Sequence, residues 1–162
     1  MKNADPFCTN YKGDTIMKLS LGCDHGAFEL KEHLKTYLTA KGHEIVDCGT
    51  YSTDSCHYPI FGKAAAEKVA SGECERGIVL CTTGIGISIS ANKVKGIRCA
   101  LCRDLLSATL TRQHNNANML ALAGGFTGKF EAEKIVDAFL TTEFEGGRHA
   151  TRVDMMMDIE HA

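Results

Sequence analysis

One cysteine stands where the sequence predicts a reactive group. Cys81 follows the apolar run 78–80 and precedes residues 82–86, which end in Gly-Ile-Gly. A short, uninterrupted β-branched and apolar run is typical of a strand buried on both faces of a parallel sheet. Open α/β sheets bind ligands at the carboxyl ends of such strands, and a helix start favours anions, thiolates included. Cys81 is therefore a candidate base or nucleophile; the alternative is an inert, buried cysteine beside an ordinary tight turn.

Two further pairs of polar residues adjoin predicted elements. Asp24 and His25 directly follow the first predicted strand, and His114 and Asn115 lie at the end of a predicted helix. An imidazole in such a place suits acid–base chemistry, because it titrates near neutral pH. Each pair also has a purely structural interpretation, in which Asp24 caps a helix and His114 complements the negative end of a helix dipole.

Two arginines have a spacing that suits an anion. Arg148 and Arg152 lie four residues apart at the start of a predicted helix, so they share one face. Two like charges there repel each other, and an anion bound between them removes the repulsion. We therefore favour anion binding over a solvated face. The other histidines that lack such company are expected at the surface: His33, His43, His57 and His161.

The composition argues against several classes of protein. The 162 residues carry a formal net charge of −2, which offers no basic face to a nucleic acid. No apolar run approaches the ~20 residues of a membrane span, and the N-terminus lacks a secretory pattern. The eight cysteines are scattered, and a chain of this length needs no disulfides. We therefore expect reduced thiols in a cytoplasmic protein.

Strand and helix patterns alternate along the chain. Predicted strands cover 17–22, 44–46, 78–80, 97–101 and 118–123. Predicted helices cover 28–41, 59–71, a segment from 87, 105–113, 131–140 and 150–160, and Asp104 is the predicted N-cap of the helix 105–113. This alternation predicts an α/β fold, a three-layer Rossmann-like sandwich with a five-stranded, mainly parallel sheet. Residues 1–16 are polar and lack periodicity, so we expect a disordered N-terminal extension before a single domain over 17–162.

Six ordered motifs carry a family resemblance that extends from Lys18 to the end of the chain. They read GCDHGAFELK (22–31), DCGTYSTDSCHYP (47–59), CTTGIGISISANK (81–93), GIRCAL (96–101), RQHNNAN (112–118) and EGGRHATR (145–152). The chain resembles the type B ribose-5-phosphate isomerases, part of a wider family that includes the galactose-6-phosphate isomerase subunits. Matches of this length and order are far more specific than an isolated Gly-x-Gly.

The resemblance implies a partner and a substrate as well as a fold. It implies a homodimer with active sites at the subunit interface, and it leaves open whether dimers pair into tetramers. It implies a sugar phosphate as substrate, with no metal and no cofactor. The composition argues against nucleic acid and membrane as partners.

The resemblance also implies roles in proton transfer. Cys81 would be the base that moves a proton between C1 and C2, and Thr83 would help to relay protons on the sugar oxygens. The amides of Gly84, Ile85 and Gly86 would hold the enediolate. These roles agree with the chemistry, since aldose–ketose isomerisation needs a base poised near neutral pH and fixed donors where negative charge develops.

Further implied roles concern the rest of the sugar phosphate. Asp24 and His114 would act in ring opening, and Asn115 would contact the sugar. The phosphate would be held by three cationic side chains: His25, Arg148 and Arg152. Remote binding of this kind orients the substrate for the chemical step.

The motifs favour ribose 5-phosphate and ribulose 5-phosphate as the interconverted pair. The Gln-His-Asn (113–115) and Gly-Gly-Arg-His (146–149) signatures are typically lacking in the galactose-6-phosphate subunits, whereas residues 57–63 look like their version. Many family members have an arginine of the phosphate cradle where this chain has Gly125. Allose 6-phosphate, galactose 6-phosphate or a tetrose phosphate is therefore an alternative substrate. A non-catalytic, flavodoxin-like binding module would explain the fold, but not why Cys81, Asp24, His114 and the arginines occur together.

Overall fold

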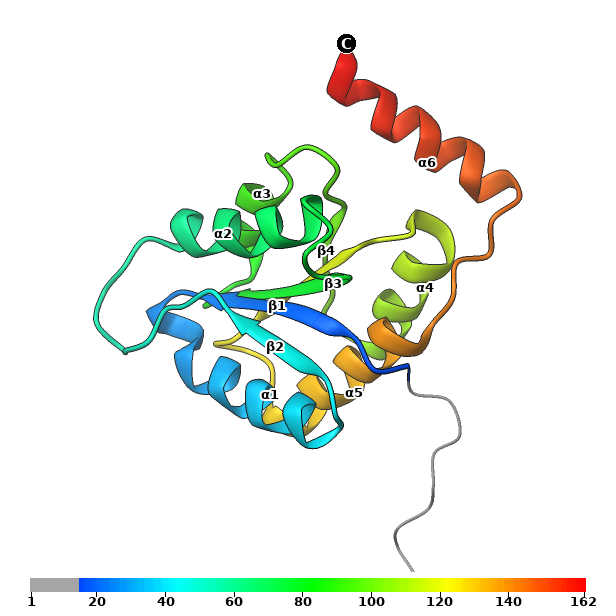
Figure 1. Cartoon of the computed structure of the whole chain (residues 1–162). Helices are drawn as coiled ribbons and strands as arrows, with labels where there is room; N and C mark the ends of the chain where they lie inside the picture. The colour runs from blue at the N-terminus through cyan, green and yellow to red at the C-terminus, as the bar shows by residue number, and fades with distance from the viewer. Residues whose placement is uncertain (1–14) are drawn as a thin grey trace, which may run out of the picture.

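The computed structural model describes residues 15–162 as a parallel sheet with helices on both faces (Figure 1). The strands are β1 (Lys18–Cys23), β2 (Glu44–Asp47), β3 (Arg76–Cys81), β4 (Cys99–Leu101) and β5 (Met119–Ala123). The helices are α1 (Phe28–Ala40), α2 (Tyr58–Ala70), α3 (Ile85–Ala91), α4 (Leu105–Asn115), α5 (Lys129–Thr141) and α6 (Arg148–Asp158), with 3₁₀ turns η1 (His25–Ala27) and η2 (Ile159–His161). The predicted three-layer α/β fold is confirmed. The disordered extension predicted for 1–16 falls mostly on residues 1–14, outside the described part of the chain.

The order of the strands locates a crevice for a ligand. The sheet runs β2-β1-β3-β5-β4, and all four pairs of neighbouring strands are parallel. The chain moves outward from β1 to β2 and then places β3 on the other side of β1, so the strand order reverses between β1 and β3. Open α/β sheets bind ligands at the carboxyl ends of strands that flank such a reversal. Cys23 pairs with Leu80, so β1 and β3 end almost level with each other there.

The alternation of side chains along β3 divides the core between the two faces of the sheet. Ile78 and Leu80 belong to the apolar cluster that includes residues of α1 and α5. Val79 and Cys81 belong to the second cluster, with residues of α2 and α3. Successive side chains of a strand point to opposite faces, so the fully apolar run that predicted this strand is buried on both sides. Cys81 consequently faces the α2–α3 layer.

The turn into α3 begins the helix earlier than the apolar pattern predicts. Gly84 has a φ of 73°, and α3 starts at Ile85 rather than Ile87. A Cβ added at Gly84 would lie 2.9 Å from the carbonyl oxygen of Leu122, so both the conformation and the space require glycine. The predicted N-cap of α4 is confirmed, because the Asp104 carboxylate accepts a hydrogen bond from the Ser107 N–H at 2.7 Å.

The last helix lies outside the sandwich. Figure 1 shows α6 at the top of the view, beyond the layers that cover the sheet. Of its side chains only His149 and Val153 are buried. The Glu160 carboxylate just beyond it accepts hydrogen bonds from the Gly96 N–H at 2.9 and 3.0 Å, which ties this end to the loop before β4. None of the helices in residues 15–162 is long and apolar enough to span a membrane.

The structure tests two expectations about side chains, the position of His43 and the state of the cysteines. His43 is buried rather than at the surface. It lies where the turn after α1 meets the start of the sheet, and its Nδ1 accepts a hydrogen bond from the Met17 N–H at 3.2 Å. Every cysteine in the described part of the chain is a free thiol, and Cys8 lies outside that part.

Candidate active site

The first group of predicted site residues lies at the carboxyl ends of β1 and β3. Asp24 follows β1, and its N–H donates to the carbonyl of Leu80 at 3.2 Å. Cys81 is the last residue of β3 and is 4% exposed. Asp24 also accepts a hydrogen bond from the Gly26 N–H at 3.0 Å, so it caps the 3₁₀ turn that follows. The structural and the functional interpretation of Asp24 are therefore compatible, since one carboxylate oxygen can cap while the other faces the crevice.

The turn after Cys81 is held by its own hydrogen bonds. The Cys81 carbonyl accepts from the Gly84 N–H at 3.3 Å and from the Gly124 N–H at 2.8 Å. Thr83 Oγ accepts from the Ile85 N–H at 3.2 Å, which leaves the threonine hydroxyl hydrogen available to donate. Two of the three amides predicted to hold an enediolate are thus engaged within the turn. The Gly86 N–H precedes the first main-chain bond of α3, from Ser88 to Gly84.

Glycine allows the two strand-end turns to touch. A Cβ added at Gly26 would overlap the Thr82 hydroxyl. The turn that carries Asp24 and His25 therefore packs directly on the turn that follows Cys81. Gly125 extends the same surface, because its N–H donates to the Thr82 carbonyl at 2.9 Å.

Two residues that sequence reasoning did not single out complete this end of the sheet. The Tyr58 ring packs against Gly86, where an added Cβ would lie 2.6 Å from the ring. Cys56 orients His25, because its N–H donates to His25 Nδ1 at 3.2 Å and its Sγ lies 3.8 Å from that nitrogen. Both belong to the long loop and the helix start that follow β2. No sequence motif marked this contact, since it joins segments about 30 residues apart.

The second group of predicted site residues lies at the opposite edge of the sheet. α4 leaves the carboxyl end of β4 and runs back, so His114 and Asn115 lie beside the amino ends of the strands. The Asn115 carbonyl accepts from Arg98 Nε at 3.2 Å, one residue before β4 begins. β3 has six residues, which corresponds to about 20 Å, so within one chain His114 lies far from Cys81.

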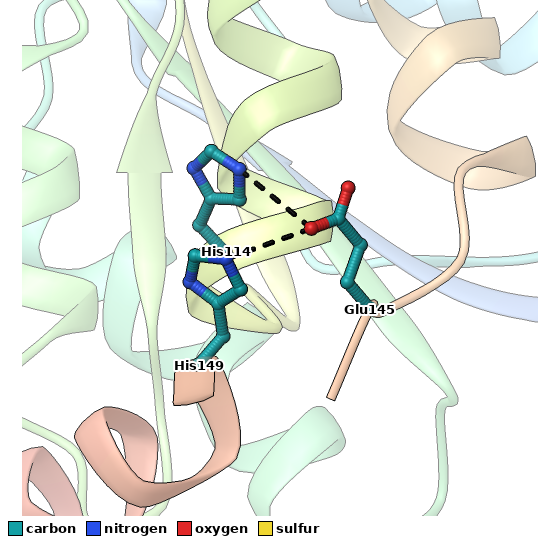
Figure 2. Close-up of side chains that lie close together, drawn as sticks. All are labelled: His114, Glu145 and His149. Atoms are coloured by element: carbon teal, nitrogen blue, oxygen red, sulfur yellow. Dashed lines mark ion pairs between the residues drawn. The ribbon is translucent and has the colours of Figure 1, made fainter. Parts of the chain in front are cut away.

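His114 belongs to a compact cluster with Glu145 and His149 (Figure 2). The two imidazole rings are stacked, with centroids 4.3 Å apart and planes inclined by 7°. One oxygen of Glu145 lies 3.5 Å from His149 Nε2 and 4.0 Å from His114 Nε2. Burial, followed by the charges of His114 and Arg148, lowers the pKa of His149 below its ordinary value. Two of the family motifs contain these residues, RQHNNAN (112–118) and EGGRHATR (145–152), but neither indicated that the three side chains lie together.

A buried arginine braces the end of α4 that carries His114. Arg112 is 5% exposed, and its guanidinium donates to the carbonyl of Ala117 and to Asn116 Oδ1. Asn116 adopts a left-handed conformation with a φ of 45°, which ends the helix. Burial lowers the pKa of Arg112 to about 10, so the side chain stays charged at neutral pH. Arg112 therefore has a structural role beside the predicted site residues.

The two predicted anion-binding arginines stand at the same edge as His114. Arg148 and Arg152 occupy the first and second turns of α6, and both are exposed. The Glu145 N–H donates to the Gln113 carbonyl at 3.1 Å, which fixes the start of α6 beside the end of α4. The predicted site residues thus form two groups: Asp24, His25, Cys81, Thr83, Gly84, Ile85 and Gly86 at the carboxyl edge, and His114, Asn115, Arg148 and Arg152 at the amino edge.

Comparisons with known proteins agree with this architecture. The family model described as Ribose/Galactose Isomerase matches residues 19–156. Galactose-6-phosphate isomerase subunit LacB of Clostridium acetobutylicum is 52% identical over 129 residues, which cover 80% of this chain and 75% of that protein. Ribose-5-phosphate isomerase B of Escherichia coli is 45% identical over 145 residues, covering 90% of this chain and 97% of that protein. A solved structure of ribose-5-phosphate isomerase B from Clostridium thermocellum is 50% identical, with a TM-score of 0.89, and covers 90% of this chain and 98% of that one.

The fold and these relatives define an enzyme of the sugar-phosphate isomerase class. The chain belongs to the Ribose/Galactose Isomerase family. The resemblance to the type B ribose-5-phosphate isomerases is thereby confirmed. Relatives named for ribose and for galactose substrates both match at high identity, so the family alone does not select the sugar.

Proposed function

We propose that the chain interconverts ribose 5-phosphate and ribulose 5-phosphate through an enediolate, with Cys81 as the base. The observation that carries this proposal is the place of Cys81 at the end of β3, at the reversal of strand order and beside Asp24. The thiolate takes the proton from C2 of the aldose and returns it to C1, while a proton moves from O2 to O1. Thr83 assists this transfer through its free hydroxyl hydrogen, and the Gly86 amide donates to the developing oxyanion.

The complete site in this proposal needs two copies of the chain. Ring opening requires an acid–base group near the sugar, and His114 of the same chain is about the length of a strand away from Cys81. A homodimer that brings His114 of the partner subunit to Cys81 joins the two groups. Arg148 and Arg152 stand beside His114 and would arrive with it to bind the phosphate.

Exposed apolar side chains support a second copy as the partner. They lie on α3, α4, α6 and η2: Ile85, Ile89, Leu105, Leu106, Leu110, Met155, Met156 and Ile159. α4 packs against α6, and α6 against η2, so the exposed apolar side chains of these three elements lie near one another. A patch of apolar side chains on a monomer marks an interaction surface. Contact between two such faces would cover these side chains.

An alternative substrate is a longer or shorter sugar phosphate. Gly125 stands where many family members carry an arginine, and it adjoins Thr82 at the carboxyl edge. The high identity to a galactose-6-phosphate isomerase subunit also favours this alternative. A panel of aldose phosphates with four to six carbons tests both. Ribose 5-phosphate should give the highest kcat/KM; a better substrate of another length would select the alternative, and no turnover of any sugar phosphate would contradict isomerase activity.

A further inference from the structure

We propose that His114, Glu145 and His149 bind a divalent transition-metal ion of the Zn²⁺ type, and that the bound ion inhibits the isomerase. The binding site rests on the geometry of the cluster alone. The inhibition also rests on the proposed function, because it assumes that His114 acts in ring opening.

The donor set is one that zinc prefers. Two imidazole nitrogens and one carboxylate oxygen form a well-known combination of protein ligands for Zn²⁺, with a fourth position left to water. The three donor atoms all lie within 4.8 Å of one another. Mg²⁺ and Ca²⁺ prefer shells made of oxygen and should bind poorly here.

The distances leave room for an ion between the donors. The separations of 3.5 and 4.0 Å from the Glu145 oxygen to the two ring nitrogens exceed hydrogen-bond lengths. A tetrahedral ion with ligand bonds of about 2.05 Å holds its donors about 3.3 Å apart. The cluster therefore has to contract by less than 1 Å along these two edges, and by up to about 1.5 Å along the edge between the two nitrogens. Small rotations of the side chains suffice, and they must also tilt the parallel rings toward a common point.

The surroundings hold the three residues in place and still admit an ion. The main chains of Glu145 and His114 are linked through the bond from the Glu145 N–H to the Gln113 carbonyl. His149 is buried, whereas the side chains of His114 and Glu145 are 38% and 49% exposed. The ion can thus enter from the solvent side. The positive charges of Arg148 and Arg152 nearby oppose a cation, so we expect affinity weaker than that of a structural zinc site.

An ion at this place would remove His114 from its proposed role. The ion takes the lone pair of Nε2, the atom that faces Glu145, and a metal-bound nitrogen can neither accept nor donate a proton at that atom.

Binding is measured first, without any assay of activity. Titration with Zn²⁺ by calorimetry and with Co²⁺ by absorption should show one ion per chain, without the charge-transfer band of a thiolate ligand. Glu145→Gln should weaken binding at least tenfold, whereas Glu143→Gln, two residues away on the same segment, should not change it. His149→Phe keeps a stacked ring and removes the ligand nitrogen, so it should weaken binding similarly; the matched control is His161→Ala.

Activity is measured second, at Zn²⁺ concentrations chosen from the binding curve. Turnover of ribose 5-phosphate should fall in proportion to occupancy, recover with a chelator and resist Mg²⁺. Unchanged affinity in Glu145→Gln and His149→Phe, or loss of binding in Cys81→Ala alone, would overturn the site. Binding at the cluster with full activity retained would overturn the inhibition only. Absence of turnover before metal is added would count against the proposed function and leave the binding result standing.

Discussion

Among single residues, Cys81 carries the proposed proton transfer. Its thiol lies at the end of β3 while its carbonyl is held by the Gly124 N–H, so removal of the sulfur leaves the turn bonded. We expect Cys81→Ala to lower kcat about 10³-fold with little change in KM, because the base acts in the transition state. Cys74→Ala, which removes another buried thiol, serves as the control. Near-normal turnover of Cys81→Ala would exclude this residue as the base.

His114 should matter only for the cyclic substrate. Ribose 5-phosphate is mostly cyclic, whereas ribulose 5-phosphate cannot close a five-membered ring because its O5 carries the phosphate. In His114→Ala we expect the forward rate to become limited by spontaneous ring opening, and therefore to stop rising with enzyme concentration. The reverse rate should stay proportional to enzyme concentration. Progress curves in both directions at several enzyme concentrations measure this. A forward rate that stays proportional to enzyme would remove His114 from ring opening.

Gly125 stands where the family resemblance implies an arginine of the phosphate cradle. Its φ lies outside the left-handed region, but an added Cβ would lie 3.0 Å from the Thr82 carbonyl oxygen, so a side chain requires a small shift of that turn. Gly125→Arg should add a charged hydrogen bond to the phosphate and lower KM for ribose 5-phosphate about fivefold. This corresponds to roughly 1 kcal/mol of binding free energy. It should also narrow the substrate range.

The control for this variant is Gly128→Arg, which adds the same charge in open space three residues away. Circular dichroism of both variants checks their folding. An unchanged ranking of ribose, allose and erythrose phosphates in a well-folded Gly125→Arg protein would show that position 125 does not face the phosphate.

Between elements, a buried ion pair joins α1 to β2. The Lys31 ammonium is fully buried and donates to Asp47 at 2.9 and 3.0 Å and to the Thr50 carbonyl at 2.8 Å. Asp47→Asn leaves the half-exposed Glu32 as the one carboxylate among residues 15–162 that still pairs with this charge. We expect the free energy of unfolding at pH 7 to fall by about 3 kcal/mol, as measured by urea denaturation. Asp54→Asn, in the exposed loop before α2, should have almost no effect.

The same pair predicts a pH dependence. Burial alone would raise the pKa of Asp47, but hydrogen bonds from Lys35, the Gly49 N–H and Lys31 lower it below its ordinary value of 3.8. A carboxyl with a lowered pKa stabilises the folded state above its unfolded pKa and loses that contribution as the pH falls through the folded value. The difference in the free energy of unfolding between wild type and Asp47→Asn should thus be constant above about pH 5 and shrink below about pH 4. A difference in the free energy of unfolding that does not shrink at all between pH 5 and pH 3 would argue against the ion pair as its cause.

Local sequence patterns were sufficient to predict the order and type of the elements. The apolar run 78–80 identifies β3 because a central strand is buried on both faces, and Asp104 identifies the start of α4 because its side chain bonds the first turn. Boundaries were less accurate where glycine decides them, as at Gly84, whose left-handed φ begins α3 two residues early. The pattern of apolar residues records burial, and it carries no information on the turn itself.

The site was predictable only where it follows directly from a strand end. Asp24 and Cys81 lie together because parallel strands end at one edge of the sheet. The alternation of strands and helices already predicts a parallel sheet, so this proximity could be predicted from the sequence. The cluster of His114, Glu145 and His149 depends on how the segment after α5 packs on the end of α4, which no periodicity records. His43 was likewise expected at the surface because no other candidate site residue stands near it in the sequence, and that absence carries no information on burial.

At the scale of the whole molecule, the separation of the two groups of site residues has a consequence that mutants can test. If each active site combines Cys81 of one subunit with His114 of the partner subunit, two inactive variants should complement each other. Cys81→Ala and His114→Ala homodimers each lack a site that can both open the cyclic sugar and isomerise it. A hybrid of the two has one intact site and one site with both defects.

We expect activity to appear when the two variant proteins are mixed, unfolded together and refolded. Random assortment makes half of the dimers hybrids, each with one of two sites intact, so about a quarter of wild-type activity should return. The assay is forward turnover of ribose 5-phosphate at an enzyme concentration where His114→Ala alone is slow. Each variant refolded by itself is the control. If both groups acted within one subunit, every subunit in the hybrid would carry a defect, and the mixture would be as inactive as its parts.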